Sequence, residues 1–359
     1  MTKMIKRKIK ALVPFLFFSA IASAQIDDAS FIRAGVDDAS KILESYVTPW
    51  ANAFGAALNG SWYNTAKPHK FGGFDFTIGV NLAIAPLSSG TYDISELGLT
   101  NFTGSGAAPS LSGKYGPRPT ITEKSPAAGV DPITFDAPNG SDLRYIPTPA
   151  IQVGIGLPLG SEVKIRYLPR IPINEGDISS VFGLGFIHSI TQYIPGNELL
   201  PYSFSLFGGF TNLKGNLPVD LRPGGLLQNQ LYSSKYTPTS WEDQMLEMDM
   251  KAWNISVIGS VNVSVVTFYG GLGYAATSSS VKLKGNFPTP TYNPTLSTTD
   301  YVYEDSGVIT NFPSVKLEDF SGLRANIGFR FKLGAMTLHF DYTRSQYNVL
   351  SGGLGVSFN

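Results

Sequence analysis

The chain has no cysteine among its 359 residues, so it can form no disulfide framework and offers no cysteine for a lipoprotein anchor. Its apolar residues nowhere run for the roughly 20 positions that a helix needs to cross a bilayer, so we do not expect a helical membrane protein. Charged residues are also scarce, at 15% against about 25% in an average soluble domain. The composition is therefore not that of an ordinary soluble domain.

Histidine and catalytic motifs are equally sparse. His69, His188 and His339 lie far apart in the chain, with no metal-ligand spacing around them. No Gly-x-Ser-x-Gly elbow, phosphate loop or dinucleotide fingerprint stands where a strand would lead into a helix. The sequence thus predicts no metal, no cofactor and no enzymatic activity.

Residues 1–24 have the pattern of a cleaved secretion signal. Five basic residues between Lys3 and Lys10 precede an apolar stretch, and Ala22-Ser23-Ala24 forms a small-residue cleavage site before Gln25. Removal of this signal would leave 22 of the 27 basic residues against all 27 acidic ones. A net negative chain lacks the basic footprint of nucleic-acid binding, so no nucleic-acid partner is expected.

What the sequence has in abundance is alternation. Between Phe74 and Ile84 every second residue is large and apolar, while those between them, such as Asp75 and Thr77, are small or polar. Because successive side chains on a strand point to opposite faces, this segment is predicted to be a strand with one apolar face. Nine further segments show the same alternation, at 151–157, 163–167, 182–186, 202–211, 253–257, 266–274, 323–332, 336–343 and 350–358.

The connections between these segments are alternately short and long. Those near 159–161, 189–199, 259–264 and 333–335 are short or modest, whereas 87–147, 214–246 and 285–316 are long, polar and rich in Pro, Gly, Ser and Thr. An outer-membrane barrel shows this asymmetry, with its short turns in the periplasm. We therefore predict an all-β fold: a transmembrane antiparallel β-barrel over residues 61–359. It would have 10–14 strands, since 87–147 has room for another pair or two.

A soluble β-sandwich is the alternative that alternation alone leaves open. One predicted strand carries Arg324, Arg330 and Lys332 on its polar face, and a dry sandwich core has no room for them. A polar barrel lumen accepts such charges. The barrel is therefore the better interpretation.

Before the strands, the period changes to that of a helix. An apolar stripe with spacings of three and four runs from Ile32 to Trp50, and a second short helix is expected from Trp50 to Leu58. Pro49 should separate the two, and Asn59-Gly60 should end the second. Residues 25–60 are thus predicted to be helical, ahead of the barrel.

Two locations for this helical segment remain open: on the periplasmic face or against another protein, or inside the barrel as a plug. In the second case its acids would neutralise lumenal cations. The candidate plug and lumen contacts are Asp37, Asp38, Glu44, Lys164, Arg166, Arg324, Arg330, Lys332, His339 and Asp341. His339 and Asp341 share a lumen face and, with a serine, would imitate a hydrolase, but ordinary lumenal hydrogen bonding explains them more simply.

The chain also resembles known families. Trp62 to Lys70, the segment His188-Ser189-Ile190-Thr191-Gln192-Tyr193-Ile194-Pro195, and Val266 to Tyr274 resemble an uncharacterised family of Bacteroidota outer-membrane barrels. The layout of N-terminal plug and barrel is similar to that of FadL-like hydrophobic-compound transporters, although those have 14 strands and no shared ligand motif is present. This second resemblance implies diffusion of small apolar molecules through a gated barrel.

The sequence accordingly favours an integral protein of a Gram-negative outer membrane, in contact with outer-membrane lipid. One hypothesis is a passive conduit for small hydrophobic, lipid-like molecules. The other is a non-transporting barrel subunit that docks other outer-membrane proteins in a larger complex.

Overall fold

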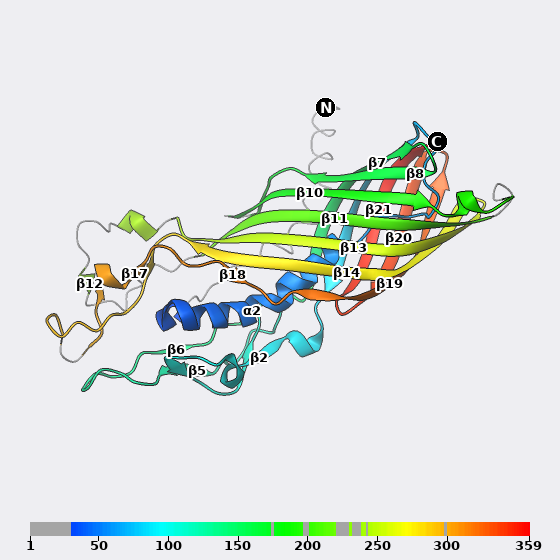
Figure 1. The fold of residues 1–359 in the computed structure, drawn as a ribbon. Coiled ribbons are helices and arrows are strands. Elements are labelled where there is room, and N and C mark those ends of the chain that lie inside the picture. The colour runs from blue at the N-terminus through cyan, green and yellow to red at the C-terminus, as the bar shows by residue number, and fades with distance from the viewer. Residues whose placement is uncertain are drawn as a thin grey trace, which may run out of the picture.

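The computed structural model describes residues 30–173, 176–196, 201–219, 230–231, 238–241, 243–297 and 300–359. Its main sheet closes into a ring of ten antiparallel strands, and all ten segments predicted from the sequence lie in it (Figure 1). Each strand pairs with the next in the chain, and the last pairs with the first. The wall strands are β1 (Phe74–Ile84), β7 (Tyr145–Leu157), β8 (Ser161–Leu168), β10 (Gly176–Ser189), β11 (Tyr202–Pro218), β13 (Met245–Val263), β14 (Val266–Lys284), β19 (Phe320–Leu333), β20 (Met336–Arg344) and β21 (Asn348–Phe358).

The two faces of this wall differ sharply. Outward side chains are large, apolar and exposed, as at Ile327 (71%), Leu272 (70%) and Ile78 (51%). Inward side chains are mostly small or polar, and they are buried: Asp75, Asn81 and Thr211 are exposed by 4% or less. A soluble sandwich would bury the apolar face instead, so this arrangement confirms the predicted barrel and excludes the sandwich.

The two ends of the barrel are unlike. Tight turns at 158–160, 264–265 and 334–335 join strands at what we call the short-turn end. In the three-residue turn 158–160, Leu159 and Gly160 both adopt positive φ, a conformation that glycine reaches without steric cost. Phe74 pairs with Phe358, so the wall also begins and finishes at this end.

The opposite end carries the long connections and is called the long-loop end. The loop predicted at 214–246 is bounded too widely, because β11 and β13 extend to leave 219–244, and the loop predicted at 87–147 lies at 85–144. No strand between Thr91 and Asp136 joins the wall, so the extra pairs allowed for in 87–147 do not belong to the barrel. The short strands there are β2 (Thr91–Asp93), β3 (Phe102–Thr103), β4 (Ala107–Pro109), β5 (Thr120–Glu123) and β6 (Thr134–Asp136).

The remaining elements are short. Small strands are β9 (Ile171–Ile173), β12 (Gln230–Leu231), β15 (Phe287–Pro288), β16 (Tyr303–Glu304), β17 (Val308–Ile309) and β18 (Val315–Lys316). Single helical turns are η1 (Ser30–Ala34), η2 (Leu87–Ser89), η3 (Ile94–Leu97), η4 (Thr191–Tyr193), η6 (Pro238–Trp241) and η7 (Asp305–Gly307). Both β9 and β18 lengthen wall strands at the long-loop end.

One helix, α2 (Gly35–Leu58), precedes the wall, and it continues through Pro49. The prediction of a break there is wrong. Proline removes one helical hydrogen bond, but tertiary packing of the buried faces on either side of it outweighs that loss. Every residue from Trp50 to Leu58 is buried, which is typical of a helix enclosed on all sides. No helix of the described chain is long and apolar enough to span a bilayer.

The contacts of α2 place its two halves differently. It touches wall strands β1, β7, β13, β14 and β21, which lie on different sides of the ring, so its later part lies within the lumen. Its first half lies among the β2–β6 connection, as Figure 1 shows. Residues 59–73 then lead from the helix to the start of β1 at the short-turn end. The predicted signal, residues 1–24, lies outside the described residues.

Candidate functional site

The lumen is the part of this molecule in which polar and charged side chains gather. An open channel would leave its lining exposed to water, yet here the lining is as buried as a protein core. Each of the following inward polar side chains is exposed by 7% or less: Asp75, Thr77, Asn81, Gln152, Lys164, Arg166, Ser205, Thr211, Asn254, Thr267, Thr277, Arg324, Thr337, His339 and Asp341. Residues 42–73 pack inside the lumen and cover these side chains.

At the long-loop end, α2 is fastened to the β2–β6 connection by a buried carboxylate. Asp38 accepts hydrogen bonds from the successive backbone N–H groups of Thr100 (2.7 Å), Asn101 (2.8 Å) and Phe102 (3.1 Å). Lys41 donates to the Gly98 carbonyl at 2.6 Å. A charged acceptor makes these bonds stronger than neutral ones, so the loop and the first half of the helix are held as one unit.

Midway through the lumen, two buried arginines meet the end of α2. Arg166 donates to the carbonyl oxygens of Leu58 (2.7 Å) and Gly60 (2.8 Å), and Arg324 donates to that of Asn59 (3.0 Å). The last carbonyls of a helix have no partner within it, and they carry the negative end of its dipole. The guanidinium groups of β8 and β19 supply hydrogen-bond donors to these carbonyls and positive charge to the helix end. We call this contact the arginine clamp.

Below the clamp the lumen is closed by an aromatic block. The Arg166 guanidinium lies 4.0 Å from the ring of Trp62, a cation–π contact. Trp62 and Tyr63 pack on Phe207 of β11 at ring distances of 5.9 Å and 5.2 Å, and Tyr63 also contacts Tyr269. These four rings belong to one buried apolar cluster.

The wall makes room for this block with glycine. A β-carbon at Gly183 or Gly185 would lie about 3 Å or less from the Trp62 indole, and one at Gly209 would meet the Phe207 ring. Because such distances are shorter than carbon–carbon contact allows, the indole can lie flat on the wall only where glycine occupies the strand. Glycines in β10 and β11 thus shape the lumen for one particular side chain.

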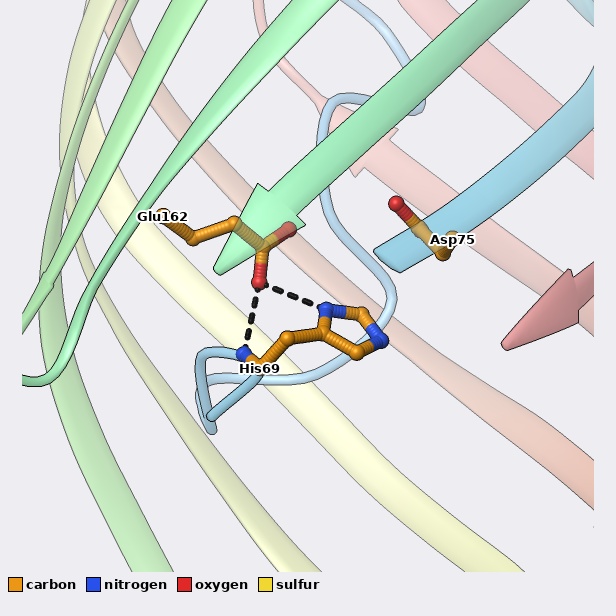
Figure 2. A group of neighbouring side chains, drawn as sticks. All are labelled: His69, Asp75 and Glu162. Carbon is orange, nitrogen blue, oxygen red and sulfur yellow. Dashed lines mark hydrogen bonds and ion pairs between the residues drawn. The ribbon is translucent and has the colours of Figure 1, made fainter. Parts of the chain in front are cut away.

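At the short-turn end a network of charges surrounds His69, and Figure 2 draws His69 with two of its members, Asp75 and Glu162. Glu162 Oε2 accepts from both the backbone N–H and the ring Nδ1 of His69, at 2.9 Å and 2.8 Å. Lys164 lies 2.6 Å from Glu162 Oε1 and 3.4 Å from Asp75 Oδ2. The other ring nitrogen of His69 lies 2.9 Å from Ser357 Oγ.

These residues offer three ligand-type groups within 4.8 Å of one another: His69, Asp75 and Glu162. No metal-ligand spacing is visible in the sequence, because the three residues come from separate segments that meet only when the ring closes. The ammonium of Lys164 already occupies the position of a cation between the two carboxylates, and both nitrogens of His69 are engaged. The arrangement is therefore an ion-pair network around Lys164, whose ammonium holds the position that a metal ion would take between the carboxylates.

The predicted pairing of helix acids with lumenal cations is wrong among the residues that the structure describes. Asp38 binds loop amides, Asp37 is exposed at the surface, and Glu44, half-buried, forms no ion pair with the lumen. The cations face backbone carbonyls and wall acids instead: a helix terminus supplies negative charge through its dipole without any acidic side chain.

The other predicted site residues lie apart from the helix. Arg330 donates to Asn64 Oδ1 at 3.1 Å, and Lys332 donates to Ser357 Oγ at 3.2 Å. Asp341 accepts from the Tyr269 hydroxyl at 3.1 Å. His339 is buried, and neither of its ring nitrogens has a hydrogen-bond partner within the described chain. His339 and Asp341 do not combine into a catalytic pair.

Sequence reasoning missed several residues of the lumen. Asp75 was detectable, since it lies on the polar face of a predicted strand. Glu162 was detectable too, because it continues the alternation of Lys164 and Arg166 one residue before the predicted segment 163–167. His69, Trp62 and Tyr63 were not, because they belong to the irregular connection between helix and wall, where no periodicity gives a direction to a side chain.

One protein family matches nearly the whole chain. The sequence profile of a family of unknown function, DUF6588, matches residues 1–358. Among curated proteins, none matches this sequence. Membership of a Bacteroidota family and likeness to FadL-like transporters stay predictions.

Solved outer-membrane barrels resemble the chain distantly. The translocator domain of autotransporter NalP from Neisseria meningitidis is 12% identical over 89% of this chain and 99% of its own, with a TM-score of 0.33. The outer membrane protease OmpT from Escherichia coli is 9% identical over 82% of this chain and 100% of its own, at 0.29. Ail, the attachment invasion locus protein of Yersinia pestis, is 9% identical over 80% and 99%, at 0.26. Similarity this distant indicates neither an activity nor a ligand.

Proposed function

We propose that this chain, which belongs to the family of unknown function DUF6588, is an outer-membrane barrel closed by its own N-terminal segment and presenting its long loops to protein partners. The observation that carries the proposal is the burial of the lumen lining. Arg166, Asn254 and Thr211 point into the lumen and are exposed by 2% or less, so no water-filled passage reaches them.

The bilayer location is supported by the outward face. A transmembrane strand needs about 9–11 residues, and β1 and β21 have 11 each, with apolar side chains outward along their length. Short turns face the periplasm in such barrels, which puts the 85–144 connection outside the cell. The N-terminal helix then extends from within the lumen to the long-loop end, on the outer side of the membrane.

The docking role is supported by the way in which the loops are built. The 85–144 connection forms two small sheets and is hydrogen-bonded to Asp38 of α2, so it is a folded surface and not a flexible loop. Preformed surfaces bind partners at a lower entropic cost than loops that must order. Passive passage of small hydrophobic molecules, in contrast, would need residues 50–66 to leave the arginine clamp and the aromatic block.

Site-specific photo-crosslinking in intact outer membranes tests this proposal. Tyr115 lies in the 85–144 connection and Leu323 on the outward wall, and their side chains are similarly exposed, at 82% and 81%. With p-benzoylphenylalanine at Tyr115 we expect a discrete protein adduct, and with the same residue at Leu323 adducts with lipid alone.

Solute flux measured in proteoliposomes provides the second readout. We expect the full-length protein to pass small hydrophobic solutes no faster than empty vesicles. Flux through the full-length protein, together with the absence of a protein adduct at Tyr115, would contradict the proposal and establish the conduit.

A further inference from the structure

Three side chains at the short-turn end form a hydrogen-bonded series. Ser357 lies on β21, His69 on the connection between helix and wall, and Glu162 on β8. The Ser357 Oγ to His69 Nε2 distance is 2.9 Å, and the His69 Nδ1 to Glu162 Oε2 distance is 2.8 Å. Serine, histidine and carboxylate are thus joined in the order found in serine hydrolases, with each contact at hydrogen-bond length.

The direction of these hydrogen bonds follows from the partners. A carboxylate only accepts, so Nδ1 of His69 carries the proton that faces Glu162. In the neutral imidazole Nε2 is then an acceptor, and it can receive only the hydroxyl proton of Ser357. Glu162 is itself fixed, by the backbone N–H of His69 at 2.9 Å and by Lys164 at 2.6 Å. The ring is therefore held in the tautomer that accepts a proton from serine.

A fourth group supplies positive charge beside the hydroxyl. Lys332 of β19 has its Nζ 3.2 Å from Ser357 Oγ, and its side chain is only partly buried. A fixed cation next to the attacking oxygen would stabilise negative charge that develops on a carbonyl oxygen bound there. The strand of Ser357, β21, carries another buried inward serine, Ser351, which is not part of this series.

We propose that Ser357 is a nucleophile toward carboxylic esters, with His69 as its general base and Glu162 as the positioning residue for the imidazole. The proposal does not depend on the closed lumen or on docked partners, because the group lies at the rim of the short-turn end. Ser357 and His69 are themselves exposed by only 4% and 6%, whereas Phe71, two residues from His69, is exposed by 77%. An ester must therefore displace side chains at this rim to reach the serine hydroxyl.

The reaction balances with water as the second substrate. Ser357 Oγ bonds to the carbonyl carbon while its proton passes to His69 Nε2. The bond from that carbon to the ester oxygen breaks, and the leaving alcohol takes the proton from Nε2. Water then gives a proton to Nε2 and attacks the acyl-serine, which releases a carboxylic acid and returns the proton to Oγ.

Labelling with a fluorophosphonate probe tests the nucleophile. The full-length protein is folded in detergent, its folded state is verified by heat-modifiable gel mobility, and labelled peptides are identified by mass spectrometry. We expect one labelled site, Ser357, absent in Ser357→Ala and unaffected in the matched variant Ser351→Ala. Folded wild-type protein that labels Ser357 no faster than Ser351 would overturn the proposal.

Two further variants distinguish catalysis from structural hydrogen bonding. His69→Asn should slow labelling of Ser357 by about 100-fold or more, the usual contribution of a general base. Glu162→Gln should slow labelling less and change its pH profile, since the imidazole loses its fixed tautomer. If His69→Asn fails to fold, hydrolysis of p-nitrophenyl acetate by wild type decides: turnover lost in Ser357→Ala supports the site, and turnover equal in both refutes it.

Discussion

The arginine clamp gives the clearest test of how the helix is held in the lumen. In Arg166→Gln, the carbonyls of Leu58 and Gly60 lose donors at 2.7 Å and 2.8 Å, and the Trp62 ring loses its cation. Each hydrogen bond to a charged group contributes about 1.5–3 kcal/mol. Part of this loss is offset, because glutamine costs less to bury than a guanidinium does. We expect the free energy of local opening at the end of α2 to fall by about 3 kcal/mol.

Hydrogen exchange at the amides of the last turn of α2 measures this opening. Since 1.4 kcal/mol corresponds to a factor of ten, exchange in Arg166→Gln should be faster by about 100-fold. Arg344→Gln is the matched control, because Arg344 ends β20 and is exposed. Equal protection of the last turn in the two variants would refute the clamp.

Three further predictions concern the contact of Asp38 with the loop, the wall and its assembly. Asp38→Asn should make the loop near residue 101 more sensitive to protease than Asp37→Asn does, because only Asp38 accepts the loop amides. Ile327→Arg should lower the free energy of unfolding in vesicles by about 2–4 kcal/mol, since its side chain faces lipid. Phe358→Asp should leave the protein unassembled and degraded, whereas Asn359→Asp should assemble, as immunoblots of outer membranes would show; normal levels of the first variant would contradict this.

The wall could be predicted from the sequence because its signal is local. Lipid on one side and packed polar groups on the other impose a period of two on each strand, and a one-residue slip would reverse every face. The alternation from Phe74 to Ile84 is therefore sufficient to define β1. The long strands β13 and β14 were predicted too short, because toward the long-loop end the polarity of their faces is reversed. In β13, Met248 and Met250 are buried, whereas Lys251 is exposed.

The interior could not be predicted in the same way. Arg166 was recognised as a lumenal cation, but its partners are backbone carbonyls, which leave no trace in residue identity. The opposite charges of the helix acids and the wall cations suggested that these side chains pair. That prediction was wrong, because the C-terminus of a helix is negative even without acidic side chains. Glu162 and Ser357 lie 93 and 288 residues after His69 in the chain, so only closure of the ring brings the three together.

Conductance in planar bilayers tests most directly whether the N-terminal segment closes the barrel. The full-length protein should carry no steady current. A variant lacking residues 26–66 removes both the helix and the aromatic residues Trp62 and Tyr63, and it should still assemble, because the hydrogen bonds of each strand are made within the wall. That variant should conduct steadily and prefer anions, since Arg166 and Arg324 would then line open water. Equal steady currents through the full-length protein and the deletion variant would contradict the closed barrel.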